Sequence, residues 1–156
     1  MPDPDIYNFR RIDARTTSSG QPTEAQLGEI AALGVTHIIN LGLHSHEKAL
    51  PDEAGSVAAL GMEYTHIPVA FDAPSDQDFS DFCTAMAAIG DMPVHVHCIV
   101  NMRVSAFFYR YRRDVLGLDE AAARVAMDSL WQPGGVWAAF IGDAASVALP
   151  HRAALT

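Results

Sequence analysis

The stretch that decides the fold is Val94-His95-Val96-His97-Cys98-Ile99-Val100-Asn101-Met102-Arg103-Val104-Ser105. It joins the pattern of a buried strand to a cysteine, a short loop, an arginine and the pattern of an apolar helix. Backbone N–H groups of such a loop and of a helix N-terminus converge on a tetrahedral anion, and a guanidinium clamps two of its oxygens. Because the same field stabilises a thiolate, we expect Cys98 to be reactive at neutral pH.

On both sides of this stretch, strand patterns alternate with helix patterns. Strands are predicted at 6–12, 35–41, 62–68 and 93–97, and a turn is predicted at 18–22. Helices are predicted at 23–33, 52–60, 76–89, 103–116, 119–131 and 136–149. Strands separated by helices indicate an α/β fold with a mostly parallel central sheet flanked by helices, which binds ligands at the carboxyl ends of its strands. Cys98 lies at such an end.

Length and composition are those of one globular domain. The chain has 156 residues, of which 49% are hydrophobic and 19% charged, and it shows no repeat or linker, so we expect a single domain over 1–156. No apolar run is as long as a membrane span. The first five residues are acidic and proline-rich, unlike a signal peptide, so we expect a cytoplasmic protein with no membrane partner.

Charge and cysteine content exclude further classes. A formal net charge of −9 argues against a polyanion-binding surface, so we expect no nucleic-acid partner and a phosphate affinity confined to the loop. The two cysteines, Cys83 and Cys98, make neither a disulfide framework nor a zinc site. The sequence predicts no particular oligomeric state.

The loop resembles the phosphate-binding loop of the cysteine-dependent protein tyrosine and dual-specificity phosphatases. In that family His-Cys is followed by five residues, an arginine and a serine or threonine. Upstream, 19–22, 34–41 and 61–69 are similar to compact bacterial members, including a group adjoining the dual-specificity phosphatases in which some proteins are thought to be sulfurtransferases. The resemblance covers nearly the whole chain. It implies a dual-specificity-phosphatase-like fold, a phosphocysteine intermediate, and no cofactor or metal.

The loop departs from the family pattern in its length. Only four residues separate Cys98 from Arg103, and Val104 stands between Arg103 and Ser105. Asn101 occupies the place where the family usually has glycine, and because asparagine tolerates a positive φ we expect the chain to turn there. Four residues is the loop length of the rhodanese-like sulfurtransferases, although the rhodanese pattern upstream of the cysteine is absent.

The resemblance implies a role for each residue of the loop. Cys98 is the nucleophile, Arg103 holds the phosphate oxygens, and Ser105 bonds the thiolate and helps it leave. His97 orients the loop through a bond to the backbone. The phosphate-binding set comprises Ile99, Val100, Asn101, Met102 and Arg103.

The family takes its general acid from an aspartate on a mobile loop after the preceding strand, which here spans 69–76. We choose Asp72, because its neighbour Phe71 is apolar and favours the protonated carboxyl. Asp76 is the alternative acid, and a solvated loop carboxylate is the plain structural interpretation of Asp72.

Other candidate residues have structural interpretations. His95 shares a strand face with His97, as metal ligands would, but no acidic or cysteine ligand accompanies them, so no metal site is expected. Cys83 is interpreted as a core residue, with a resolving partner for oxidised Cys98 as the alternative. Ser75 and Asp78 form the pattern of a helix capping box.

Three functions remain open on the sequence. The preferred one is a cysteine-dependent phosphatase acting on a phosphorylated small molecule or phosphoprotein. The second is a rhodanese-like sulfurtransferase that carries a persulfide on Cys98. The third is a catalytically weak phosphate-binding module, a pseudophosphatase in which the shortened loop misplaces Arg103.

Overall fold

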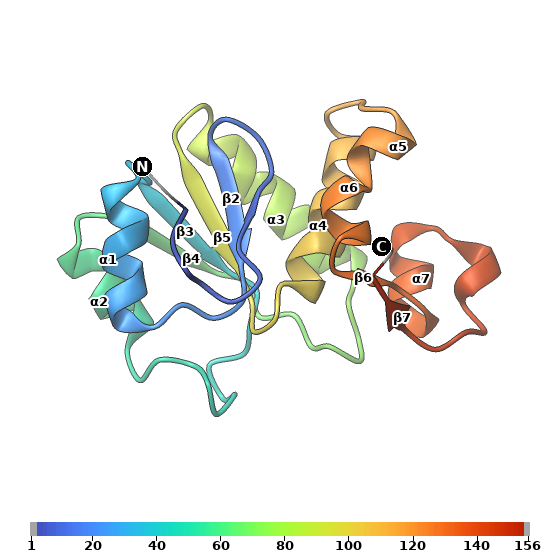
Figure 1. Ribbon diagram of the computed structural model, residues 1–156, viewed down its shortest axis with the longest axis horizontal. Coiled ribbons are helices and arrows are strands. Elements are labelled where there is room, and N and C mark those ends of the chain that lie inside the picture. The colour runs from blue at the N-terminus through green and yellow to red at the C-terminus, as the bar shows by residue number, and fades with distance from the viewer. Residues whose placement is uncertain (1–2, 155–156) are drawn as a thin grey trace.

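The computed structural model describes residues 3–154 and has a central five-stranded sheet with helices on both faces (Figure 1). Its strands lie in the order β1-β2-β5-β3-β4. Their bounds are Arg10–Arg11 (β1), Thr16–Ser19 (β2), His37–Asn40 (β3), Glu63–His66 (β4) and Val94–His97 (β5). β1 pairs antiparallel with β2, and every other pairing in this sheet is parallel. The predicted α/β class with a mostly parallel sheet is confirmed.

Two layers of helices cover the sheet. Helices α1 (Glu24–Ala32) and α2 (Glu53–Ala59) pack on one face, and α3 (Asp76–Ile89) and α4 (Met102–Asp114) pack on the other (Figure 1). The predicted capping box of α3, formed by Ser75 and Asp78, is present. No helix in the stretch 3–154 is both long and apolar enough to cross a membrane.

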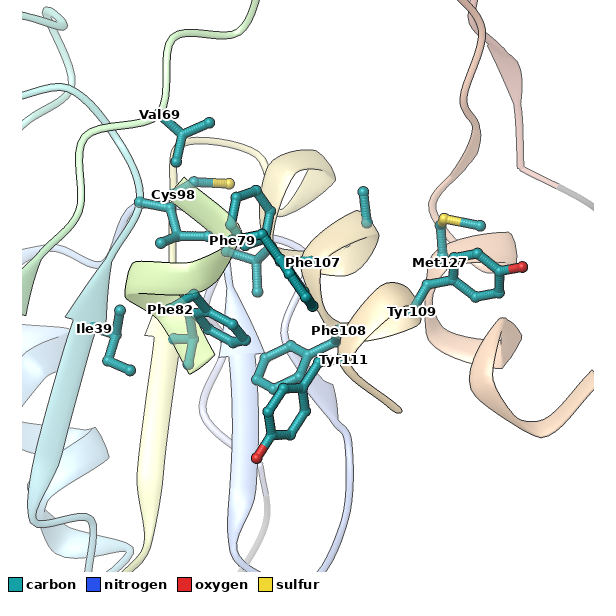
Figure 2. Close-up of a cluster of buried hydrophobic side chains, with 14 of the residues drawn as sticks. Ile39, Val69, Phe79, Phe82, Cys98, Phe107, Phe108, Tyr109, Tyr111 and Met127 are labelled. Carbon is teal, nitrogen blue, oxygen red and sulfur yellow. The ribbon is translucent and has the colours of Figure 1, made fainter. Parts of the chain in front are cut away.

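The alternation of side chains along β5 places its valines and histidines on opposite faces. Val94 and Val96 join the larger hydrophobic cluster, which includes Phe82 and Phe107 from α3 and α4 (Figure 2). His95 and His97 point toward the α1 and α2 face, where a second cluster lies. Both histidines are fully buried. Each therefore needs hydrogen-bond partners inside the protein.

The N-terminal predictions are wrong in two places. The expected strand at 6–12 is strand only at Arg10–Arg11, because Asn8 adopts a positive φ of 55° and turns the chain. The expected turn at 18–22 begins inside β2, whose four residues Thr16–Ser19 are polar and yet all buried. Their hydroxyl groups bond side chains of β5 and its loop, so a strand without apolar residues is stable here.

The two C-terminal helix predictions are also wrong in extent. The segment 119–131 breaks into α5 (Glu120–Ala123) and α6 (Val125–Asp128). The segment 136–149 holds α7 (Gly135–Ile141), which Gly142 ends at a φ of 82°, and a 3-10 turn η1 (Ala144–Ser146). β6 (Trp131–Gln132) pairs antiparallel with β7 (Arg152–Ala153), a contact that local sequence patterns do not reveal.

Candidate active site

The loop that follows β5 runs from Cys98 to Asn101 and enters α4. Cys98 is a free, fully buried cysteine at the carboxyl end of the central strand, beside Val69 and Phe107 in the larger cluster (Figure 2). Asn101 precedes α4 with a left-handed φ of 71°, as the sequence predicted. The shortened loop therefore turns at Asn101 and leads directly into the helix.

The carbonyl oxygens of residues 98–101 all accept hydrogen bonds from groups outside that segment. In chain order the donors are His97 Nδ1 at 3.0 Å, Gln21 N at 3.0 Å, Asn8 Nδ2 at 2.8 Å and Ser105 N at 3.0 Å. These bonds hold the negative ends of the loop dipoles away from the face above Cys98.

The backbone N–H groups of the same region differ from its carbonyls in their hydrogen bonding. Within residues 3–154, none of the backbone N–H groups from Ile99 to Val104 donates to an acceptor. Three of them, starting at Met102, open α4, whose helix dipole adds positive potential at this end. A loop with bound carbonyls and free N–H groups at a helix N-terminus has the electrostatics of an anion cup.

Arg103 connects the loop to the segment after β4. Its guanidinium is nearly buried, and Nη1 donates to the carbonyl of Val69 at 2.7 Å. The guanidinium carbon lies 5.8 Å from the ring centre of Phe71. Nε and Nη2 bond no acceptor within the described chain, so the other edge of the planar fork is available to an anion.

The Ser105 hydroxyl has two partners in the structure. It donates to the Met102 carbonyl at 2.9 Å and accepts from the Trp131 indole N–H at 3.0 Å. Trp131 is buried, so this bond satisfies a polar group of the core. In this arrangement the hydroxyl hydrogen points toward the Met102 carbonyl.

The two candidate acids differ in their surroundings. Asp72 is exposed on the loop between β4 and α3, next to Phe71, whose carbonyl accepts from the Trp137 indole at 2.7 Å. Asp76 lies in the first turn of α3 and pairs with Arg110 at 2.9 Å. The structure therefore leaves the Asp72 carboxyl the freer of the two.

His97 makes the backbone bond that the sequence assigned to it and also a bond that the sequence did not predict. Its Nε2 lies 2.7 Å from Oε2 of Glu53, the first residue of α2. Gln21 donates its side-chain N–H to Oε1 of the same carboxylate at 2.8 Å. Sequence reasoning missed both residues. Glu53 follows the N-cap residue Asp52. An acidic residue in the first turn of a helix is ordinarily exposed and interacts favourably with the helix dipole, so the sequence gives no sign that this one is buried.

Two further supports of the loop were missed in the N-terminal segment. Asn8 holds the Val100 carbonyl, as described above, and Gly20 packs against the Ile99 carbonyl so closely that a Cβ at this position would collide with it. The stretch 19–22 carried the resemblance to compact bacterial phosphatases, and the structure shows that its glycine and glutamine contact the loop.

The remaining candidates lie apart from the anion cup. His95 bonds Thr17 at 2.7 Å and Ser19 at 2.8 Å, and it contributes to no cluster of three metal-ligating side chains among residues 3–154. Cys83 is a free, half-buried thiol on α3, and burial raises its pKa. A thiol with a raised pKa beside the core is a poor partner for rapid exchange.

A groove of about 240 Å³ adjoins the loop at Ile99. Its other lining residues come from the N-terminal turn, from the link between β2 and α1 and from the segment after β3: Tyr7, Gln21, Pro22, Thr23, Lys48 and Leu50. Lys48 is the single lysine of a chain with a net charge of −9. The groove is therefore a mainly apolar surface with one cation, next to the residue that follows Cys98.

Comparison with known proteins agrees with this geometry. Two crystal structures of a DUF442 candidate phosphatase from Shewanella putrefaciens CN-32 match the chain at 34% and 31% identity. The first match covers 78% of each chain with a TM-score of 0.72. The second covers 89% of this chain and 91% of the other, with a TM-score of 0.78. No family model matches the sequence.

More distant matches show the same fold. TpbA of P. aeruginosa, crystallised in complex with phosphotyrosine, is 23% identical over 82% of this chain and 75% of its own, with a TM-score of 0.64.

Among curated proteins, a beta-lactamase hydrolase-like protein of Agrobacterium fabrum is 34% identical in sequence over 91 residues, 56% of this chain. The matched region spans only 21% of that relative.

Proposed function

This chain belongs to the DUF442 family of phosphatase-like proteins, and from that premise we propose that it is a cysteine-dependent phosphatase that hydrolyses phosphate monoesters. The observation that carries the proposal is the polarity of the loop at residues 98–104. Its carbonyls are bound from outside and its N–H groups are free, which suits three oxygens of a phosphoryl group above the Cys98 sulfur.

In the first chemical step the Cys98 thiolate attacks phosphorus. The S–P bond forms as the P–O bond to the leaving group breaks, and the leaving oxygen takes a proton from the general acid. Water then attacks phosphorus and gives a proton to the carboxylate left by the general acid. The S–P bond breaks, inorganic phosphate leaves, and the thiolate is restored. Free N–H groups at the α4 N-terminus stabilise the charge on the equatorial oxygens in both steps.

Arg103 stabilises the same transition state through its guanidinium. With Nη1 on the Val69 carbonyl, its Nε–H and Nη2–H edge can bond two phosphoryl oxygens. The bond to Val69 thereby links anion binding to the loop that carries the general acid. The early position of Arg103 in the sequence is offset by the turn at Asn101, which shortens the path into α4.

We assign the general acid to Asp72. Its carboxyl makes no hydrogen bond or ion pair with any residue of the described stretch 3–154, whereas Asp76 is paired with Arg110. The bonds from Arg103 to Val69 and from Trp137 to Phe71 fix the loop just before Asp72. In this proposal the Ser105 oxygen stays on Trp131, and only the hydroxyl hydrogen turns from Met102 toward the sulfur in the second step.

The groove beside Ile99 is the proposed site of the leaving group. Tyr7 and Leu50 offer apolar contact, and Lys48 offers a charge to a second anionic group. An apolar groove with one cation suits an aryl or alkyl phosphate more than a polyanion.

A sulfurtransferase is the second candidate, and the four-residue loop favours it. In that reaction the Cys98 thiolate takes the outer sulfur of thiosulfate and releases sulfite, and the persulfide then gives this sulfur to an acceptor such as cyanide. The same free N–H groups would bind the oxygens of thiosulfate. The family match favours the phosphatase, whereas the alternative rests on the loop length and on the resemblance to a bacterial group in which some proteins are thought to be sulfurtransferases.

Two parallel assays test the proposal. Purified protein is expected to release phosphate from an activated aryl phosphate in the presence of a chelator, and Cys98→Ser is expected to abolish this release. Thiosulfate-to-cyanide transfer is measured on the same samples. Sulfur transfer without phosphate release would favour the second candidate. Phosphate binding with neither activity would indicate the binding module.

A further inference from the structure

A buried carboxylate lies directly behind the cysteine loop. The Glu53 side chain is 1% exposed and the His97 side chain is 0% exposed, and 2.7 Å separates Oε2 of Glu53 from Nε2 of His97. On the other side of the imidazole, Nδ1 lies 3.0 Å from the carbonyl oxygen of Cys98. Glu53, His97 and the backbone of Cys98, the proposed nucleophile, are therefore joined by consecutive hydrogen bonds.

Both ring nitrogens of His97 face acceptors. A carbonyl oxygen has no hydrogen to give, and the Glu53 carboxylate is kept ionised. Burial alone would raise the pKa of Glu53, but hydrogen bonds and charge from His97, with hydrogen bonds from Gln21 and Tyr64, hold it below its ordinary value. Only an imidazole with hydrogens on both nitrogens can donate to both neighbours. The two contacts fit a ring that donates both to the Cys98 carbonyl and to the Glu53 carboxylate.

His95, two residues earlier, is in the opposite situation. The Ser19 hydroxyl donates to the Gly20 carbonyl, so its oxygen accepts from Nε2 of His95, and Nδ1 accepts from the Thr17 hydroxyl. One donor and one acceptor fit a neutral ring, and burial holds the pKa of His95 well below its ordinary value. The two inward histidines thus differ in their hydrogen-bond partners: His95 faces two hydroxyl groups, and His97 faces a carbonyl and a carboxylate.

We propose that Glu53 is a positioning residue for the nucleophile: it holds His97 as a cation, and this cation fixes the Cys98 carbonyl and stabilises the Cys98 thiolate. The inference rests on the proposed function only in treating Cys98 as a thiolate nucleophile, whether it attacks phosphorus or sulfur. Glu53 itself touches neither the substrate nor the reacting sulfur.

The orientation of the Glu53–His97 pair determines whether it favours or disfavours the Cys98 thiolate. His97 adjoins Cys98 in the chain and bonds its carbonyl, whereas Glu53 lies on the far side of the imidazole. The backbone of Cys98 therefore meets the positive end of the pair, and a positive charge near a thiol favours its thiolate form.

The other titratable groups around His97 are few. His95 precedes it by two residues on β5, and Tyr64 and His66 lie on β4, one strand beyond β3. His44, after β3, stacks on His66 with ring centres 3.7 Å apart. Burial and the charge of His44 lower the pKa of His66 despite its bond to the Gly42 carbonyl, so near neutral pH this ring adds no competing charge. Arg103 is the cation on the opposite side of Cys98.

Nitrogen NMR of the wild-type imidazoles tests the charge directly and needs no variant. At pH 7.5 both ring nitrogens of His97 are expected to show the shifts of protonated nitrogen, whereas His95 shows one protonated and one unprotonated nitrogen. A single protonated nitrogen in His97 at this pH would overturn the proposal.

Alkylation of Cys98 by iodoacetamide, followed by peptide mass spectrometry across pH, tests the consequence. In Glu53→Gln the midpoint of the rate profile is expected to rise by about one pH unit, so that alkylation at pH 6 is about tenfold slower, while the high-pH plateau is unchanged. Glu63→Gln is the matched control, because Glu63 pairs at 2.8 Å with the half-buried His37 while remaining 80% exposed. Its profile is expected to follow the wild type.

The outcomes separate the two proposals. A Glu53→Gln profile that coincides with the wild type, in protein shown to be folded by circular dichroism, would overturn the positioning role. Should this variant fail to fold, the wild-type NMR measurement still decides. A shifted alkylation profile without any phosphate release would support the role of Glu53 and reject only the phosphatase.

Discussion

Asn8 and Asn101 exchange hydrogen bonds across the loop. The Asn8 side chain donates to the Val100 carbonyl at 2.8 Å, and the Asn101 side chain donates to the Asn8 carbonyl, also at 2.8 Å. Both residues have positive φ, 55° and 71°. Each asparagine thus turns its own segment and bonds the other segment, so the N-terminal turn and the loop hold one another in place.

Asn101→Gly is expected to keep activity and lose stability. Glycine adopts the positive φ, but the bonds to the Asn8 carbonyl and the Ser18 hydroxyl disappear, which costs about 1–3 kcal/mol in the free energy of unfolding. Asn101→Val adds backbone strain to the same losses, so we expect it to lose most activity. Urea unfolding and phosphate release measure the two effects. Equal activity in both variants would contradict the importance of the turn.

Arg103→Lys is expected to reduce kcat/KM by about a hundredfold. The guanidinium bonds the Val69 carbonyl and in the proposed mechanism also bonds two anion oxygens, whereas lysine offers only a point charge. Arg112→Lys, on the same helix but lining a separate surface groove, is the control and is expected to retain wild-type rates. Retention of full activity by Arg103→Lys would show that the bidentate contact is not used.

Asp72→Asn is expected to slow hydrolysis of esters with poor leaving groups by about a hundredfold or more, while sparing those whose leaving group needs no proton. Rates measured over a series of aryl phosphates give this dependence as a slope against leaving-group pKa. Should Asp76→Asn change the slope and Asp72→Asn leave it unaltered, the acid role moves to Asp76.

Ser105→Ala is expected to have a larger effect on the free energy of unfolding than on the rate of the first chemical step. Alanine leaves the buried Trp131 N–H without its acceptor, which costs about 1–3 kcal/mol. Trp131→Phe removes the donor and the need for an acceptor together, so Ser105→Ala made in that background should cost less. Thermal and urea unfolding of the four proteins in this cycle measure the coupling. Additive losses would contradict the bond.

The pH dependence of stability is expected to reflect His95. Burial, with a smaller effect of the His97 charge, holds the pKa of His95 well below 6.5, whereas in the unfolded chain the ring titrates near that value. Below pH 6.5 the unfolded chain therefore binds more protons, and the free energy of unfolding falls by up to about 1.4 kcal/mol per pH unit. Urea unfolding at pH 7.5, 6.5 and 5.5 measures this slope. His95→Gln should show a shallower one.

The alternation of strands and helices, and the loop itself, could be predicted because each leaves a local signal. β5 has a period-two pattern of valine and histidine, α3 has its capping box, and the turn at Asn101 follows from the φ preference of asparagine. In each case the residues that determine the conformation lie next to one another in the chain.

What could not be predicted depends on contacts between distant residues. β2 is a buried strand without apolar side chains, and it is stable because its hydroxyl groups meet His95 and Asn101, more than 70 positions away. Glu53 has the local pattern of an exposed helix start, and only the packing of α2 on this face of the sheet buries it against His97. No window of neighbouring residues contains that information.

The donors that hold the loop carbonyls come from widely separated parts of the chain. Asn8 lies 92 positions before Val100, and Glu53, which holds His97, lies 44 positions before it. Contacts of such long range form late, after most of the chain has collapsed. In the proposed mechanism, the reactivity of Cys98 therefore depends on contacts that a nascent or partly denatured chain lacks. A misfolded copy is accordingly expected to be without an activated sulfur.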